Sequence, residues 1–186
     1  LDDLEYDQEN TGSSFSQSTS VQLFFESCLE DQLAESIDEI ALNGGYYESS
    51  DELLVDDFDL VYYDFLPYYY LDYSYNVISQ NQIELELAKA LTINIGPCLN
   101  FSSFPYVVES NLDDLEISTD ISEGFVKANV KIPISVEAES LTSNMESFEV
   151  EVESSLYKLY NLAQEISLQQ EEAVDQICLT CFANDS

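Results

Sequence analysis

Carboxylates are the most abundant reactive groups in this sequence, and the residues that usually work beside them in catalysis are missing. The chain has 38 Asp and Glu residues, 4 Lys, no Arg and no His. Without His, a Ser-His-Asp or Cys-His nucleophile cannot be built. Phosphoryl transfer lacks both a GxxxxGK[ST] loop and an arginine to stabilise the transferred charge. Two carboxylates could hydrolyse a glycoside, but no pair stands out, so we expect a protein that is not an enzyme.

The four cysteines include one short motif, Cys178-Leu179-Thr180-Cys181. A CxxC motif occurs in redox centres, in half of a zinc site and in local disulfides. This one is expected to close a helix, where the dipole has the wrong sign to lower a thiol pKa. A zinc site would also need Cys28 and Cys98, because no second CxxC exists. We therefore prefer disulfides, and the even count favours an oxidising compartment.

Calcium is the one ion that the acidic turns could bind, because it prefers hard carboxylate oxygens. Two clusters are candidate sites, Asp56, Asp57 and Asp59 in the first and Asp113, Asp114 and Glu116 in the second. Neither has the spacing of an EF-hand, and an ordinary solvated turn is the alternative. No other cofactor is expected. Asn100 and Asn184 each begin an Asn-x-Ser pattern and are predicted glycosylation sites if the protein is exported.

The stretch FLPYYYLDYSYNV, Phe65 to Val77, concentrates tyrosine. In a single strand, alternate residues would share a face, with Tyr69, Leu71, Tyr73 and Tyr75 on one side and Tyr68, Tyr70, Asp72 and Ser74 on the other. One face is expected to join the core. Tyr68 and Tyr70 are then the best candidates for contacts with a partner, because the chain has neither Arg nor Trp to serve instead.

The net charge of -34 restricts both the partners and the solvent of this protein. Nucleic acids and anionic membranes bind through Lys and Arg, so neither is expected as a partner. Self-repulsion would oppose folding unless salt screened it, since the Debye length falls from about 10 Å at 0.1 M salt to about 3 Å at 1 M. A strongly saline habitat is therefore the preferred interpretation, and an acidic or calcium-rich habitat is the alternative. No segment is apolar enough to be expected to span a membrane.

Three helices are predicted from apolar residues that recur at steps of three and four. The first starts at Ser20, with Thr19 and Gln22 as a capping box, and stops at Asn43-Gly44-Gly45. The second covers about 81–95, with Ser79 and Gln82 as its capping box. The third covers about 155–177.

Strands are predicted between the second and third helices. Unbroken alternation from Val126 to Ala138 predicts one long strand, with or without a bend at Pro133. Its predicted partner centres on Phe148 to Val152, which leaves Leu141 to Ser147 as the connection. A further strand is expected over 115–121, and short strands over 53–75. Lys127 and Lys131 are expected to face the glutamates of the partner strand, in ordinary pairs.

The order of elements predicts an α+β fold, in which amphipathic helices pack on an antiparallel β-meander. Residues 1–20 are predicted to be an acidic, Ser/Thr-rich arm, which could pair with a neighbouring subunit. Residues 21–186 are predicted to form a single domain, with a helical and Tyr-rich half over 21–98. The meander and the C-terminal helix occupy 99–186.

Several segments in order resemble uncharacterised, exported cell-surface proteins of small-genome, host-associated archaea. The segments are CLEDQLAESIDEIALNGGYY from Cys28, LPYYY from Leu66, CLNFSSF from Cys98, LYNLAQEI from Leu159 and ICLTC from Ile177. Members of that family typically carry a hydrophobic N-terminal segment reminiscent of pilin-type precursors, and this sequence lacks that segment. The resemblance implies a structural role for all four cysteines. Of the three full pairings we prefer Cys28–Cys98 with Cys178–Cys181, and cross-pairing stays open.

These observations favour an extracellular or cell-surface location and a structural subunit of a surface filament or layer, with a possible role in adhesion. A homo-oligomer held by protein contacts is the expected assembly. The main alternative is a monomeric ectodomain that binds a protein, a glycan or calcium. A cytosolic acidic adaptor or nucleic-acid mimic is a third hypothesis, and it predicts free thiols.

Overall fold

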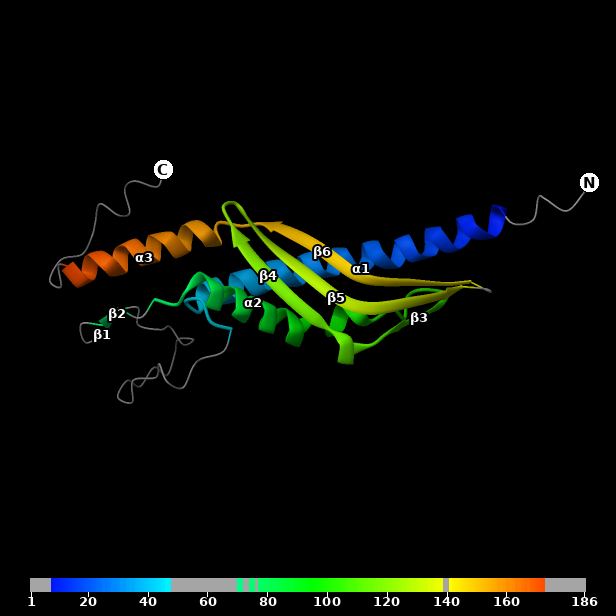
Figure 1. Cartoon of the computed structure of the whole chain (residues 1–186), viewed down its shortest axis with the longest axis horizontal. Coiled ribbons are helices and arrows are strands. Elements are labelled where there is room, and N and C mark those ends of the chain that lie inside the picture. Colours follow the sequence, from blue (N-terminus) through cyan, green and yellow to red (C-terminus); the bar gives the residue numbers. More distant parts are fainter. Residues whose placement is uncertain (1–7, 48–69, 72–73, 76, 139–140, 173–186) are drawn as a thin grey trace, which may run out of the picture.

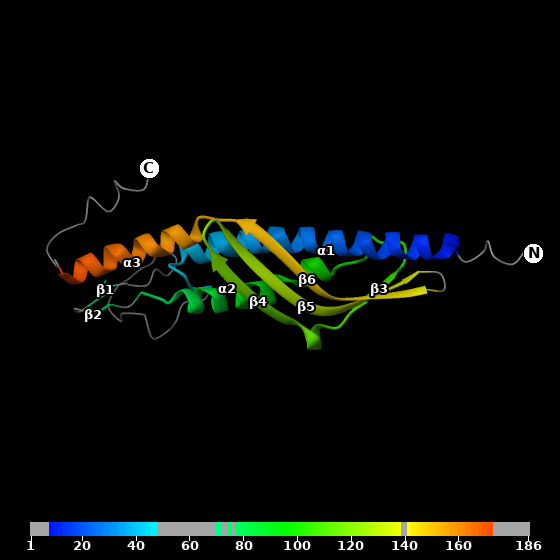
Figure 2. The same ribbon diagram turned by 45° about the horizontal axis from the view of Figure 1, so that its top comes forward.

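The protein is an elongated α+β domain in which two helices lie on one face of an antiparallel sheet. The computed structural model describes residues 8–47, 70–71, 74–75, 77–138 and 141–172. Figure 1 shows α1 and α2 behind the sheet, and α3 leaving the body at the end opposite the N-terminus. The view turned by 45° shows the same layers, with α1 running almost the whole length of the body (Figure 2). The predicted fold class is confirmed.

Helix α1, Gln8–Leu42, supplies the longest apolar stripe. Its buried apolar side chains are Val21, Phe25, Leu29, Leu33, Ile37 and Ile40. The stop is confirmed, because Gly44 and Gly45 have positive φ values of 65° and 98°, a backbone conformation that favours glycine. The Gly45 amide also donates to the Ile40 carbonyl at 2.8 Å.

The predicted start of this helix at Ser20 is wrong, because α1 begins at Gln8. Thr19 therefore lies inside the helix and does not cap it. Residues 8–20 belong to α1, so they are not the extended arm that could add to a neighbour as a strand. A tertiary hydrogen bond helps to hold this polar part, because the Tyr106 hydroxyl donates to the Gln17 carbonyl at 3.2 Å. Ser18 is also buried.

Helix α2, Gln80–Asn94, confirms the second predicted helix and its cap. The Gln82 amide donates to the Ser79 hydroxyl at 3.2 Å, which satisfies one of the free donors of the first turn. Its buried side chains are Ile83, Leu87, Ala90 and Leu91. After α2 comes the short 3₁₀ helix η2, Gly96–Leu99, which carries Cys98 into the core.

The sheet has four strands, β3 Val107–Ser110, β4 Glu116–Ser122, β5 Phe125–Ala138 and β6 Leu141–Glu153. Strands β4, β5 and β6 pair in chain order and antiparallel, so the predicted meander is confirmed. Strand β3 pairs with the second half of β5. Both β3 and β4 lie on the side of β5 away from β6, and the 3₁₀ helix η3, Leu112–Asp114, connects them.

Pro133 lies at the point along β5 where its partner on one side changes from β4 to β3. The register with β6 shifts by one residue between Lys131 and Ile134, a β-bulge. Proline fits here because it has no ladder hydrogen bond to lose, and its carbonyl accepts from the Asn111 amide at 3.3 Å. The predicted connection over 141–147 is wrong, because those residues are strand. Before the bulge, the residues of β6 that face the helices are odd-numbered, and after it they are even-numbered, so Met145 rather than Glu146 faces the helices. The alternation of buried and exposed residues is therefore interrupted in the sequence of β6.

Two smaller elements complete the described chain. Strand β1, Tyr70–Leu71, pairs antiparallel with β2, Ser74–Tyr75, and Tyr70 is opposite Tyr75. These two short strands agree with the predicted short strands of this region, but their pairing means that Tyr70 and Tyr75 do not share one face of a single continuous strand, as was also predicted. Helix α3, Leu156–Glu172, confirms the third predicted helix within the described residues.

Candidate assembly edge of the sheet

A disulfide joins the middle of α1 to η2 and fixes the helical layer. The Sγ atoms of Cys28 and Cys98 are 2.06 Å apart, and the two residues are 70 positions apart in the chain. Cys98 is fully buried, beside the apolar stripe of α1. This half of the predicted pairing is confirmed. Cys178 and Cys181 lie outside the described residues, so their pairing stays a prediction.

The β4 edge of the sheet is closed at Ile121 by two polar side chains from the first turns of α2. The Glu84 carboxylate accepts from the Ile121 amide at 3.1 Å, and the Gln80 side-chain amide donates to the Ile121 carbonyl at 2.9 Å. Gln80 also donates to Glu84 at 3.0 Å, which holds the two side chains together. They therefore occupy the positions that the backbone of a further strand would take. The Thr119 hydroxyl adds a bond to the Glu84 carbonyl.

The opposite edge, β6, points main-chain groups away from the sheet. In an antiparallel pair, opposed residues alternate between bonded and non-bonded pairs. The Ser154 amide donates to the Gly124 carbonyl at 3.0 Å, so Ser154 and Gly124 form a bonded pair. Every second residue of β6 from there is also in a bonded pair, so the main-chain groups of Val152 and Val150 point toward β5.

The main-chain groups of Glu149, Glu151 and Glu153 consequently point outward from β6. None of these groups has a hydrogen-bond partner among the described residues. The three side chains are exposed on the outer face of the sheet. Within the described part of the chain, the β6 edge is thus open and acidic at these three residues, whereas the β4 edge is closed at Ile121.

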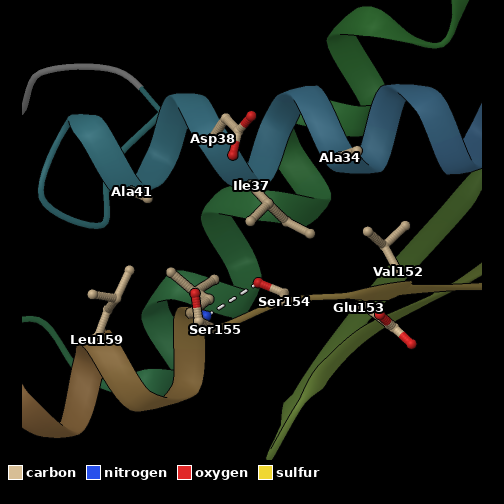
Figure 3. Close-up of a pocket in the computed structure, with 10 residues that line it drawn as sticks. Ala34, Ile37, Asp38, Ala41, Val152, Glu153, Ser154, Ser155 and Leu159 are labelled. Carbon is tan, nitrogen blue, oxygen red and sulfur yellow. Dashed lines mark hydrogen bonds between the residues drawn. The ribbon is translucent and has the colours of Figure 1, made fainter. Parts of the chain in front are cut away.

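A hollow of about 220 Å³ lies beside the end of this open edge. The lining residues are Ala34, Ile37, Asp38 and Ala41 from α1, Val152 to Ser155 from the end of β6 and the turn after it, and Leu156 and Leu159 from α3. In Figure 3, Ile37 and Ala41 of α1 lie across the hollow from Leu159 of α3, with Val152 beside them, whereas Glu153 points away. The Leu156 amide donates to the Ser154 hydroxyl at 3.1 Å, which fixes the turn into α3. The lining mixes apolar side chains with the polar groups of Ser154 and Ser155, and Asp38 and Glu153 add negative charge.

Two lysines on β5 neutralise part of the outer face. Lys127 pairs with Glu149 at 3.1 Å, as the sequence predicted. Its hydrogen bond to Glu149 is the main cause that raises the pKa of Lys127, and the charges of Glu149, Glu151 and Asp120 act in the same direction. Lys131 pairs with Glu116 on β4 at 3.3 Å, so its predicted partner on the opposite strand is wrong. Glu151 and Glu153 take part in neither ion pair.

The candidate calcium cluster of Asp113, Asp114 and Glu116 is not assembled. Asp114 accepts from the Asn111 side chain at 2.6 Å, and Glu116 pairs with Lys131. Across the described ranges, no group of three acidic or cysteine side chains is placed to hold a metal ion. The other cluster, Asp56, Asp57 and Asp59, falls outside those ranges and stays a prediction.

The remaining predicted sites are only partly described. Asn100 is exposed after η2, and its side-chain oxygen accepts from the Ser102 hydroxyl at 2.7 Å. Modification of Asn100 stays a prediction. Asn184 and Tyr68 lie outside the described residues, and for Tyr70 only the strand pairing is described.

Three features of the sheet edges are not visible in the sequence. Gln80 and Glu84 give only the weak signal of a polar pair four residues apart at the start of an amphipathic helix. The glutamates of β6 were expected to face solvent, but alternation does not say which strand lies at an edge. The hollow depends on the angle at which α3 leaves the sheet.

Among the described helices, none has the length and apolar content needed to cross a bilayer. Comparisons of the chain with protein-family models, curated proteins and solved structures find no match.

Proposed function

We propose that this chain is a non-enzymatic, extracellular structural subunit of a surface assembly in a salt-adapted archaeon. The observation that carries the proposal is the Cys28–Cys98 disulfide, which ties α1 to η2 in the core of the domain. Disulfides persist in oxidising surroundings and are rare in reducing cytosol. The resemblance to exported, pilin-like surface proteins agrees with that location.

The shape and the edges of the domain support a role in assembly. A long N-terminal helix lies along the sheet and is cross-linked to the helical layer, which gives a rod-like subunit that resists local unfolding (Figure 2). An open strand edge can also join a subunit to a different protein of the assembly. The charge of -34 keeps subunits apart in dilute salt and lets them approach when salt screens it.

Salt-dependent assembly tests this function. The oxidised protein is analysed by size-exclusion chromatography with light scattering, and by negative-stain microscopy, at about 0.1 M and about 3 M NaCl. We expect a monomer in dilute salt and ordered oligomers or filaments in concentrated salt. Replacement of Tyr68 and Tyr70 by Ser should reduce assembly more than stability.

A monomer at every salt concentration would refute the structural-subunit role. A monomeric binding ectodomain is the second candidate, and the open acidic edge of β6 is the observation that favours it. Free Cys28 and Cys98 in protein isolated from its native source would refute the extracellular location for both candidates.

A further inference from the structure

We propose that the open edge of β6 and the adjacent hollow bind an extended segment of a partner protein in which basic and apolar residues alternate. This inference goes beyond the structural-subunit proposal, because it names a binding surface and the chemistry of its occupant. The segment adds to the sheet as a further strand, next to Glu149, Glu151 and Glu153.

The backbone of β6 supplies the first part of this recognition. The amides and carbonyls of the three glutamates point outward, and no described residue bonds them. An added strand would pair with them over five residues of β6. The same addition at β4 is blocked near Ile121, because the Glu84 and Gln80 side chains already bond to its amide and carbonyl. The end of β4 near Ile121 is therefore a poorer site for strand addition than the three glutamates of β6.

The side chains of β6 specify the occupant. Neighbouring residues across two strands share a face, so alternate residues of the added strand would lie beside the three exposed glutamates. Lys or Arg fits those positions, because Glu151 and Glu153 take part in neither of the ion pairs at Lys127 and Lys131. The other residues of the added strand would lie beside Val150 and Val152, on the face that α1 covers.

The hollow receives one of those apolar side chains. It begins at Val152 and is lined by Ile37 and Ala41 of α1 and by Leu159 of α3. Its volume of about 220 Å³ is large enough for a branched or aromatic side chain. Leu159 is 52% exposed at the rim, and a side chain placed there would cover it.

A second copy of this chain fits the edge poorly. Two β6 edges side by side would place glutamates next to glutamates, which repel. The chain has only four lysines, and Lys127 and Lys131 already lie on β5 of the same sheet. Strand β5 itself shows the favoured pattern, since its alternating lysines and apolar residues pair with the other side of β6.

Binding is tested with a fluorescent peptide of about nine residues in which Lys and Val alternate. Fluorescence anisotropy is measured against the oxidised protein in about 0.1 M NaCl, where the protein is expected to be monomeric. A peptide of the same composition, with Lys and Val in blocks of two, is the control for charge alone. We expect the alternating peptide to bind at least tenfold more tightly, and equal affinity would overturn the inference.

Two protein variants separate the backbone from the charge. Glu151→Pro removes an outward amide and leaves the ladder to β5 intact, so it should abolish binding. Glu151→Thr keeps the amide and loses one charge, so it should weaken binding by only about threefold. Circular dichroism checks that both variants fold. Equal affinity of both variants and the unchanged protein would overturn strand addition.

Peptides methylated on backbone nitrogen keep the test valid if the proline variant does not fold. Methylation of one alternate set of peptide residues should abolish binding, and methylation of the other set should leave it unchanged. An equal effect of both sets would contradict strand addition.

The hollow is tested with Ala41→Leu, which should weaken binding severalfold, while Leu42→Phe adds bulk outside the lining and should not. If neither variant changes the affinity, the hollow has no part in binding.

The outcomes distinguish this inference from the structural-subunit proposal. Filaments in concentrated salt, together with no peptide binding, would overturn this inference alone. Peptide binding by a protein that stays monomeric in all salts would overturn the structural-subunit role alone. Salt-dependent dimers that Glu151→Pro abolishes, with no peptide binding, would show that a second copy occupies the edge and would overturn the basic partner.

Discussion

Removal of the Cys28–Cys98 disulfide should cost about 4 kcal/mol of stability. The cross-link closes a loop across 70 positions of the chain. Chain entropy for such a loop is about 15 cal/mol/K, which corresponds to about 4.4 kcal/mol at 25 °C. Small domains have free energies of unfolding of about 5–15 kcal/mol, so this loss is a large fraction of the total.

The assay is urea unfolding of the double variant Cys28→Ala with Cys98→Ala, in about 2 M NaCl to screen the charge. The unchanged protein under reducing conditions is the control, and it should unfold at nearly the same urea concentration as the variant. A loss below about 1 kcal/mol would refute the loop-closure reasoning, because it would mean that the unfolded chain gains little freedom when the bond is absent.

Three further predictions concern local structure. Gly45→Ala should cost more stability than Gly124→Ala: both glycines have positive φ, but a Cβ at Gly45 would lie 2.8 Å from Ile78 Cγ2, whereas nothing lies within 4 Å at Gly124. The expected difference in urea unfolding is about 1–3 kcal/mol, and equal losses would contradict the close contact. Glu84→Ala should cost about 1–3 kcal/mol, because the Ile121 amide loses its acceptor, and it should speed hydrogen exchange of that amide; unchanged exchange would mean that the edge is closed by other groups. Burial, with the charge of Glu86 as a second cause, raises the pKa of Tyr46 above 10.0, and burial also raises the pKa of Tyr106. A phenol whose pKa is raised by folding contributes stability below pH 10, and that contribution is lost as pH rises through the pKa of the folded state. The melting temperature should therefore fall above about pH 10, and it should fall less steeply in Tyr46→Phe.

Periodic elements of this fold could be predicted because burial of one face leaves a mark in the sequence. Helix α2 shows its apolar stripe and its Ser79 cap, and the structure has both. Strand β5 shows unbroken alternation from Val126 to Ala138, and its buried side chains follow that alternation. In each case local periodicity and tertiary packing agree.

Elements whose stability comes from distant contacts could not be predicted in the same way. The first turns of α1 are polar, and the bond from Tyr106 to the Gln17 carbonyl joins residues 89 apart. The first half of β6 loses its expected phase because of a bulge beside Pro133. Sequence periodicity shows neither the contact nor the register shift.

The candidate site was predictable in its charge and not in its geometry. Alternation places Glu149, Glu151 and Glu153 on an exposed face, as the structure has them. Which edge is open depends on where α2 packs, because Gln80 and Glu84 of α2 bond to β4. These residues are 35 or more positions away from their strand partners in the chain. The Cys28–Cys98 bond was the preferred pairing, although spacing alone leaves three.

The position of the disulfide also determines how this protein would respond to tension. A pull applied between the two ends of the chain would pass from Cys28 directly to Cys98, because the covalent bridge is the shortest path. The segment between these cysteines would bear no load, and its extended length of about 240 Å would not contribute to the extension of the chain. Reduction would release that length, so the bond acts as a mechanical stop in the middle of the long helix.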